Sequence, residues 1–532
     1  MFKGVNPIDR AKPLASRARR TQHRGMIRIP TRLAIVALLS LGLAQPALAK
    51  PGQPKPDPVD AATAVAATTA NLMQIGNIDD DPAGPRLNAV IVVNPAAAQQ
   101  AAALANTGIL RGRTVLVKDN IETRDMPTTA GSLALAGNAT GRDAPVVARV
   151  RAEGGVILGK TNLSEWANIR GNRSSSGWSG AGGQTRNPHA IDRNPCGSSS
   201  GSGAAVAAGM AWAAIGTETD GSITCPASAN GIVGFKPTVG LVSRTWIVPI
   251  SVSQDTAGPM ASSVQDAALL LTAMAGSDPA DPATVEADRH KVDFTRGLPG
   301  ASLKGVRIGV LRKQAGPHAG VNALFDKAQA DLVAAGAVLV PIDYDPPGEM
   351  FRDESLVLRF ELKEGLNAYL AGLPGKPRVR SIDDVIAFNK AHPQEELRWF
   401  GQDTFEAAAQ LTDREAYLKA RANSLRLAGP EGIDRLLREN SVVVLIAPTE
   451  GPAWPIDLVT GDHFLPIGAG SLPAIAGYPH LTVPMGAVEG LPVGLSFIGG
   501  KWDDARVLEL GAAYERARTA PLAVPSFKRW GE

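Results

Sequence analysis

Short apolar runs alternate with longer, alanine-rich stretches along most of the chain. Runs of four to six mostly apolar residues bounded by turn residues predict strands, and apolar positions at helical spacing predict helices. Strands are predicted at 89–93, 114–117, 156–159, 306–311, 337–342, 442–447, 481–484 and 493–498. Helices are predicted at 60–73, 96–105, 146–152, 204–209 and 321–335. This alternation predicts a layered α/β fold built on a mostly parallel or mixed sheet.

The first 60 residues depart from this pattern and predict export. Residues 1–49 combine nine Lys and Arg with a twelve-residue apolar run, 33–44, and a small-residue site that ends at Ala49. This layout is typical of a secretory signal peptide, and the apolar run is shorter than the about 20 residues of a membrane-spanning helix. We therefore expect cleavage after Ala49, a periplasmic or secreted protein, and no stable membrane insertion. The alternatives are an uncleaved anchor and a start at Met26.

The rest of the chain is expected to form one catalytic body with short extensions. Residues 50–60 are rich in proline, which opposes helix and central strand and predicts a tether. A catalytic domain is expected over 61–525, followed by a short tail at 526–532. Residues 345–440 are more charged and more helical, as in a cap or insertion over the sheet. The Asp-, Pro- and Gly-rich stretch 276–303 is the best candidate for an internal boundary.

Composition and charge narrow the class of protein. A hydrophobic fraction of 44% is too high for a disordered protein, and two cysteines in 532 residues exclude a disulfide framework or a zinc ribbon. Residues 1–49 hold nine of the 54 basic residues and one of the 51 acidic ones, so the remainder has a net charge of −5. Nucleic-acid binding therefore has no electrostatic basis. Seven scattered histidines without metal-ligand spacing predict no metal site, and no cofactor is expected.

Three segments carry residue types that suit nucleophilic catalysis. Lys118 follows the apolar strand predicted at 114–117. A segment rich in Gly and Ser, 196–203, leads into a predicted helix, and a further segment of small and polar residues spans 216–227. Taken singly, each has an ordinary explanation, as a solvated lysine or as a tight turn with a good helix cap.

Together, these segments resemble the amidase signature family. Cys196-Gly-Ser-Ser-Ser-Gly-Ser-Gly203 is similar to the family's Gly/Ser core, Gly216–Ala227 to its nucleophile segment, and Gly234–Gly240 to its Gly-x-Lys-Pro-Thr-x-Gly motif. Residues 254–260 and 490–495 also look like family segments, so the resemblance covers nearly all of the chain after the tether. It implies a serine amidohydrolase with a large mixed β-sheet flanked on both sides by α-helices.

The resemblance also implies a Ser-Ser-Lys triad. Ser222 would attack the amide carbonyl, and Ser198 would relay its proton to Lys118. Because only a neutral lysine can accept a proton, the pKa of Lys118 must lie well below its ordinary value of about 10.4. Burial at the end of an apolar strand would lower it. The other implied features are an oxyanion hole from the backbone N–H groups of Thr219, Asp220 and Gly221, a cis bond between Gly197 and Ser198, and loop support from Ser199.

Variants within the motifs narrow the resemblance to a bacterial subgroup, the peptide amidases. The variant segments are 164–168, 182–188 and 218–226. The subgroup hydrolyses the C-terminal carboxamide of peptides and releases ammonia, so a small-molecule or peptide amide substrate and a monomeric enzyme are expected. Asp220 replaces a family glycine, and Thr224 stands where many relatives carry Arg, which suits a neutral substrate end. The main alternative is a hydrolase of small amides or cyclic oligoamides in the same family.

Other functions account for parts of this pattern. Gly197–Gly201 also satisfies G-x-S-x-G, the nucleophile elbow of α/β-hydrolases, which would make Ser199 the nucleophile and require a downstream Asp and then a His. The downstream histidines are His290, His318, His392, His463 and His480, and none of them lies in a recognisable motif. The A subunit of a tRNA amidotransferase shares the family motifs, but it is cytoplasmic and works with partner chains. An exported, inactive binding protein is opposed by the intact set of two serines and one lysine.

Four further residues are predicted near the site. Cys196 and Cys225 lie close in sequence to the two serines. Buried free thiols are the favoured interpretation, and a disulfide, which export would permit, is the alternative. Trp454 is a candidate wall of the acyl pocket, although large aromatic residues also fill cores. Asn172, in a loop rich in Gly and Ser, is a candidate polar contact to the peptide.

Overall fold

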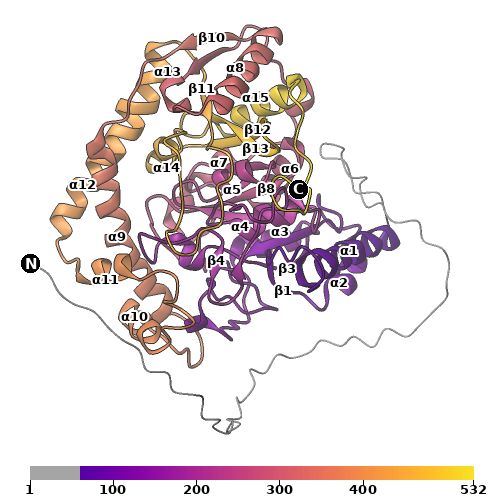
Figure 1. The fold of residues 1–532 in the computed structure, drawn as a ribbon, viewed down its shortest axis with the longest axis vertical. Coiled ribbons are helices and arrows are strands. Elements are labelled where there is room, and N and C mark those ends of the chain that lie inside the picture. The colour runs from indigo at the N-terminus through magenta and orange to yellow at the C-terminus, as the bar shows by residue number, and fades with distance from the viewer. Residues whose placement is uncertain (1–59) are drawn as a thin grey trace, which may run out of the picture. The chain divides into compact units, whose positions relative to one another are not determined.

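An eleven-stranded mixed β-sheet runs through the computed structural model, which describes residues 60–532 (Figure 1). In spatial order its strands are β1 (Val90–Val93), β3 (Val156–Thr161), β2 (Thr114–Lys118), β6 (Ala213–Glu218), β8 (Thr256–Ala261), β7 (Val233–Lys236), β12 (His480–Val488), β13 (Leu491–Ile498), β11 (Val444–Pro448), β9 (Arg307–Val310) and β10 (Val338–Pro341). All eight predicted strands are confirmed, whereas β6, β7 and β8 were not predicted. A separate small hairpin joins β4 (Trp178–Ser179) to β5 (Gly183–Gln184).

Parallel and antiparallel pairs alternate in blocks across the sheet. Strand β2 is parallel to both β3 and β6, and β9 is parallel to both β10 and β11. The strands between these two blocks pair antiparallel. The sheet is therefore mixed, as the family resemblance implied.

Helices cover both faces of this sheet. Successive side chains of a strand point to opposite faces, and in β2 Val115 and Val117 enter one apolar core while Leu116 enters another. The first core is closed by α3 (Pro145–Ala152), α6 (Val264–Met274), α8 (Ala319–Ala334) and α15 (Asp504–Ala517). The second is closed by α1 (Ala61–Ile75), α2 (Ala97–Leu104), α4 (Ser200–Ala207) and α5 (Thr224–Ala229). The predicted helices are confirmed, and the sheet is flanked on both sides.

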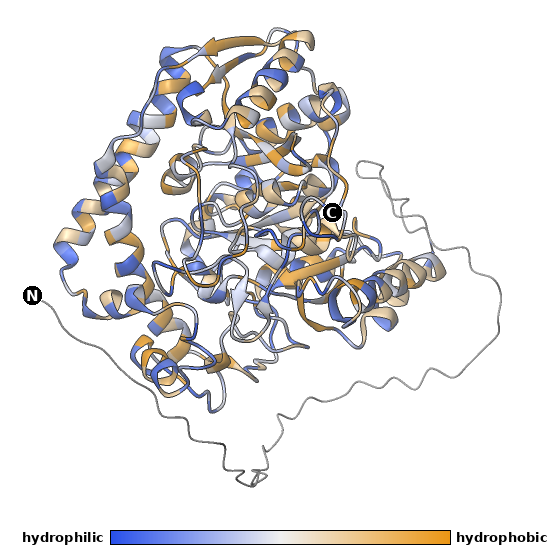
Figure 2. Ribbon diagram, viewed as in Figure 1, coloured by the Kyte–Doolittle hydropathy of each residue, from blue (hydrophilic) through white to orange (hydrophobic). Residues whose placement is uncertain are grey.

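A mostly helical region follows β10, as expected for residues 345–440. It consists of α9 (Gly348–Ala371), α10 (Ile382–Ala391), α11 (Asp403–Gln410), α12 (Arg414–Ala428) and α13 (Arg435–Glu439). These are the orange helices along one side of Figure 1, where α9 packs along α12. In Figure 2 hydrophilic and hydrophobic residues alternate along α9 and α12, which is typical of helices with one face in the core and one in solvent. The short helices α7 (Ala287–His290) and α14 (Ser471–Ala476) complete the set.

The structure places no domain boundary at 276–303. Residues 60–532 belong to a single compact unit, and Phe294 and Leu298 from this stretch are buried in the main core. The polar residues there serve local contacts instead, as in the ion pair between Asp281 and Arg244 at 2.6 Å. No helix within residues 60–532 is long and apolar enough to cross a membrane. The predicted signal peptide and almost all of the predicted tether lie outside the described residues.

Candidate active site

Two neighbouring parallel strands bring the candidate residues to one edge of the sheet. Lys118 is the last residue of β2, and Glu218 is the last residue of the adjacent β6. The carboxyl ends of parallel strands lie at the same edge. The loop after Glu218 carries Ser222 and leads into α5, while Ser198 lies two residues before α4. Residues that are 80 to 104 positions apart in sequence therefore meet at this edge.

Lys118 is fully buried and positioned to accept a proton. Its Nζ lies 2.8 Å from Ser198 Oγ, 3.1 Å from the carbonyl oxygen of Thr217 and 2.9 Å from Thr217 Oγ1. A neutral amine has two N–H donors and one lone pair. Thr217 can take both donors, which leaves the lone pair for the Ser198 hydroxyl. Burial lowers the pKa of Lys118 to about 7, against the opposing charges of Asp255 and Glu218.

The segment that carries Ser198 is fixed by hydrogen bonds to β6. The bond between Gly197 and Ser198 is cis, as the family resemblance implied. The Ser199 hydroxyl donates to the carbonyl of Thr217 at 3.1 Å and accepts from its N–H at 3.2 Å. The backbone N–H of Ser199 donates to the carbonyl of Ser222 at 3.1 Å. Ser199 therefore ties both serine segments to the end of β6.

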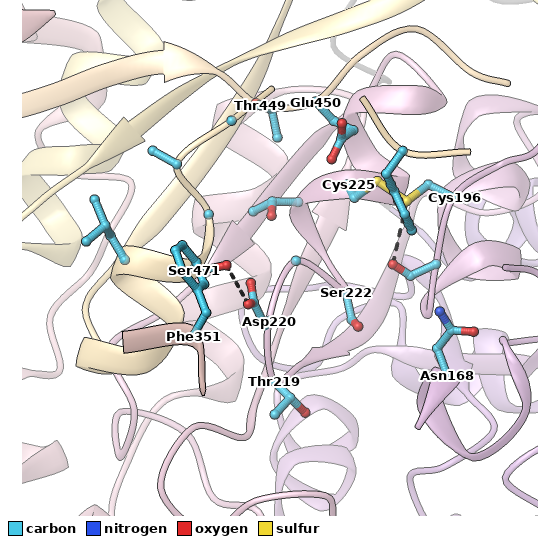
Figure 3. Close-up of a pocket in the computed structure, with 18 of the residues that line it drawn as sticks. Asn168, Cys196, Thr219, Asp220, Ser222, Cys225, Phe351, Thr449, Glu450 and Ser471 are labelled. Carbon is cyan, nitrogen blue, oxygen red and sulfur yellow. Dashed lines mark hydrogen bonds between the residues drawn. A yellow bond between two sulfur atoms is a disulfide. The ribbon is translucent and has the colours of Figure 1, made fainter. Parts of the chain in front are cut away.

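Ser222 lies in a pocket of about 390 Å³ at this edge of the sheet (Figure 3). Ser222 is 8% exposed. In the described part of the chain, no hydrogen bond joins the Ser222 hydroxyl to Ser198, although Ser198 is bonded to Lys118. The structure thus brings Lys118 and Ser198 into contact and holds Ser222 beside them through the backbone of Ser199.

The loop before Ser222 presents unused backbone donors to the pocket. Within residues 60–532, the N–H groups of residues 219–222 donate no hydrogen bond to the protein, and all four residues line the pocket. Gly221 has a φ of +76°, a conformation that favours glycine. The carboxylate of Glu218 accepts the next two N–H groups, those of Ile223 at 2.7 Å and Thr224 at 3.0 Å. Such free N–H groups can stabilise an oxyanion.

Several carboxyl groups surround the loop. Asp220 accepts a hydrogen bond from Ser471 Oγ at 2.7 Å, drawn as a dashed line in Figure 3. Burial raises the pKa of Asp220 to about 6, and burial together with the nearby Asp220 raises the pKa of Glu354 well above its ordinary range. Asp255 holds the other side of the loop, accepting from Thr219 Oγ1 at 2.6 Å and from the N–H groups of Ile250 and Ser251 at 2.8 Å.

Cys196 and Cys225 form a disulfide, so the favoured prediction of two free thiols is wrong. Both cysteines line the pocket, and the bond links the segment before Ser198 to the first turn of α5 (Figure 3). Each cysteine is a few residues from a serine that the fold brings together, which places the two sulfur atoms within bonding distance. The disulfide therefore joins the two candidate catalytic segments covalently.

The two predicted substrate contacts do not line this pocket. Trp454 packs behind the disulfide and donates from its indole nitrogen to Asp462 at 3.2 Å. Asn172 lines a neighbouring cavity, where its side-chain amide donates to Asp403. The pocket walls come instead from α9 and from the chain between β11 and α14. Among them are Phe351, Thr449 and Glu450 (Figure 3).

The nucleophile elbow of an α/β-hydrolase does not fit this arrangement. Ser199 is fully buried, and both hydrogen bonds of its hydroxyl go to the backbone of Thr217. His480, one of the five downstream histidines, lies in β12 and is bonded to Ser496 Oγ at 2.7 Å. No group of three or more His, Cys, Asp or Glu side chains within residues 60–532 is arranged to hold a metal ion.

Sequence reasoning missed several residues that support the site. Thr217 provides two of the three partners of Lys118, and Asn120 donates to its hydroxyl at 2.9 Å. Glu218 lies within the segment 216–227 that resembles the family's nucleophile segment, but its role as acceptor for the N–H groups of Ile223 and Thr224 was not predicted. The signal available in the sequence was closeness to the predicted catalytic residues: Asn120 follows Lys118 by two residues, and Glu218 precedes Ser222 by four.

Comparison with known proteins agrees with this geometry. The family model named Amidase matches residues 81–508. A probable amidase of Arabidopsis thaliana is 39% identical over 457 residues, covering 81% of this chain and 83% of the relative. The A subunit of a glutamyl-tRNA(Gln) amidotransferase from Symbiobacterium thermophilum is 36% identical over 447 residues, covering 80% and 86%.

A solved structure gives a closer match. The peptide amidase of Stenotrophomonas maltophilia superposes with a TM-score of 0.83 and 49% identity, covering 87% of this chain and 95% of that one. The family model and these relatives each span most of the sequence. The chain therefore belongs to the amidase family, the amidase signature hydrolases of C–N bonds.

Proposed function

We propose that this amidase uses Lys118, Ser198 and Ser222 to hydrolyse the C-terminal carboxamide of peptides, yielding the peptide acid and ammonia. The observation that carries the proposal is the 2.8 Å hydrogen bond between the buried Lys118 amine and the Ser198 hydroxyl, next to a pocket that contains Ser222. A pKa of about 7 leaves much of this amine neutral at neutral pH.

In the proposed first step, Ser222 Oγ bonds to the amide carbon. Its proton passes to Ser198 Oγ, whose own proton passes to the lone pair of Lys118. The carbonyl oxygen becomes an oxyanion, and the free N–H groups of residues 219–222 are its candidate donors. The protons then return through Ser198 to the amide nitrogen, the C–N bond breaks, and ammonia leaves. Water hydrolyses the acyl-enzyme by the same route.

The substrate assignment is supported by the likeness to peptide amidase and by the shape of the site. The solved relative carries the name peptide amidase, and it covers nearly the whole folded chain. Residues from α9 and the chain after β11 extend the pocket well beyond the nucleophile loop, which leaves space for an acyl group of peptide size. An ammonia leaving group needs no pocket of its own.

We also propose that the protein is exported. Residues 1–49 have the layout of a signal peptide, and the disulfide between Cys196 and Cys225 is typical of oxidising compartments. Sequencing the N-terminus of periplasmic material tests the proposal: the expected first residue is Lys50. A cytoplasmic protein that retains Met1 or Met26 would contradict it.

The activity is tested by ammonia release from a blocked dipeptide amide, a simple aliphatic amide and a peptide without a C-terminal amide. We expect ammonia from the dipeptide amide alone. The Ser222→Ala variant is expected to lose it, whereas Ser199→Ala keeps part of it, because Ser199 supports the loop and does not contact the substrate. Turnover of the aliphatic amide without the dipeptide amide would identify a small-amide hydrolase instead.

A further inference from the structure

The charged residues that line the pocket around Ser222 are all acidic. Among its lining residues, Asp220 and Glu450 are acidic, and none is Lys, Arg or His. The other walls are neutral and partly apolar, with side chains such as Phe351 and Ile467. A charged group on a substrate would therefore meet carboxyl groups in this pocket and no positively charged side chain.

Glu450 has no cationic partner within the described chain. Its carboxyl accepts one hydrogen bond, from the N–H of the next residue, Gly451, at 2.9 Å. Within residues 60–532 Glu450 forms no ion pair, and the nearby charged group that shifts its pKa is the acidic Asp220. Figure 3 shows the Glu450 carboxyl on the pocket side of its loop, across from Ser222. By contrast, Asp220 is bonded to Ser471 and is attracted by the buried Lys236.

A carboxyl in this setting is well suited to bind a cation. Burial, with the nearby Asp220, raises the pKa of Glu450 to about 8, so its uncharged form is favoured at neutral pH when no cation lies beside it. A cation that enters would supply the missing partner and form a charge-assisted hydrogen bond with the ionised carboxylate. When the substrate is neutral, the uncharged carboxyl of Glu450 does not repel the oxyanion that forms at Ser222.

We propose that Glu450 is a specificity-determining residue and that the pocket favours amides whose acyl part carries a positive charge. This inference rests on the proposed function. Because ammonia is the leaving group, the group that fills the pocket is the acyl part. The positive charge could be a basic side chain of the last residue or the free amino group of a short peptide amide. A substrate with a carboxylate in this position would be disfavoured.

The test compares amides that differ in charge. Nα-acetyl-lysine amide has a charged side chain, and Nα-acetyl-norleucine amide has an uncharged side chain of similar length. Glycyl-norleucine amide places the positive charge on the amino terminus instead. We expect kcat/KM for at least one of the two charged amides to exceed that for Nα-acetyl-norleucine amide by about tenfold, mainly through a lower KM. In Glu450→Gln this ratio should fall to near one. Glu415→Gln, which alters an exposed glutamate in the first turn of α12, should keep the parent ratio.

The outcomes separate the two proposals. If the parent releases ammonia from Nα-acetyl-norleucine amide but shows no preference for either charged amide, or if Glu450→Gln keeps the preference, the inference is overturned while the proposed function stands. If no peptide amide is hydrolysed, the proposed function itself fails. A partial return of the preference in Glu450→Asp, with an unchanged melting temperature, would separate loss of charge from loss of folding. A preference that stays lost in Glu450→Asp, with reduced melting temperatures in both variants, counts against the inference.

Discussion

The pKa of Lys118 predicts how activity depends on pH. Only the neutral amine can accept the proton of Ser198, so kcat/KM should be low in acid, rise with pH and reach a plateau in weak base. With a pKa of about 7, half of the enzyme holds a neutral lysine at pH 7. At pH 5 the neutral fraction falls to about 1%.

The neutral fraction of Lys118 at pH 7 depends on its burial. With its ordinary pKa of 10.5, Lys118 would be neutral in about 0.03% of molecules at pH 7. Burial between Ser198 and Thr217 therefore raises the neutral fraction of Lys118 at pH 7 about a thousandfold. The predicted profile follows from this environment rather than from the amino acid itself.

The assay is the initial rate of ammonia release from Nα-acetyl-norleucine amide, at concentrations well below KM, between pH 5 and pH 9.5. We expect one acid limb that falls tenfold per pH unit, with its inflection near pH 7. Lys118→Met should lose at least about a hundredfold in kcat/KM and should lose the limb. A circular dichroism spectrum like that of the parent serves as the control for folding.

Two neighbouring carboxyls titrate in the same range and could produce a similar limb. Asp220 has a pKa of about 6, and Glu450 has a pKa of about 8. Glu450→Gln should therefore retain the inflection near pH 7 with the uncharged substrate. A profile that is flat from pH 5 to pH 9, or an inflection near pH 10, would refute the assignment of Lys118 as a buried proton acceptor. An inflection that disappears in Glu450→Gln would assign it to Glu450.

Three other substitutions test the loops around the site. Replacing Cys196 and Cys225 with serine should lower the free energy of unfolding by about 3–4 kcal/mol, measured by urea titration, because the bond closes a loop of 29 residues; unchanged stability would contradict this. Gly221→Ala should lower kcat and cost about 1–2 kcal/mol, because its φ of +76° strains any other residue, although the space is open. Ser199→Ala leaves the buried N–H of Thr217 unbonded and should cost about 1–3 kcal/mol in the same titration; a cost below about 0.5 kcal/mol would show that this bond is not needed.

The outer strands of the sheet could be predicted from the sequence, but three central ones could not. Strands such as β11, Val-Leu-Ile-Ala-Pro, are rich in branched apolar residues. In contrast, β6 is Ala-Ala-Ile-Gly-Thr-Glu and β8 is Thr-Ala-Gly-Pro-Met-Ala, in which small residues outnumber the branched and aromatic ones that predict strands. β8 needs a small residue at Gly258 because the backbone of Phe235 lies against it, and β6 needs small residues because Ser199 packs closely on it. A side chain at Gly216, for example, would meet Ser199 Oγ at 2.8 Å.

Some features of the candidate site could likewise be predicted from the sequence, and others could not. The triad candidates stand in motifs that a family resemblance can locate, and the free thiol prediction failed because pairing depends on two segments meeting in space. The roles of Thr217 and Asp255 depend on distances between separate strands and loops. Their residue types are common at strand ends, so no local pattern distinguishes them. Asn172 and Trp454 were predicted from residue type and loop position, and the structure places both outside the pocket.

The pocket is built from two separate parts of the chain, and this has an evolutionary consequence. The groups proposed for chemistry lie between Lys118 and Cys225, whereas the opposite walls come from α9 and the chain from Thr449 to Leu472. Selection can therefore change the preferred acyl group through substitutions in the later part without altering the proposed proton relay. Among relatives that share the relay, divergence in substrate preference should concentrate in these later segments. Laboratory evolution for new amide substrates would best begin there.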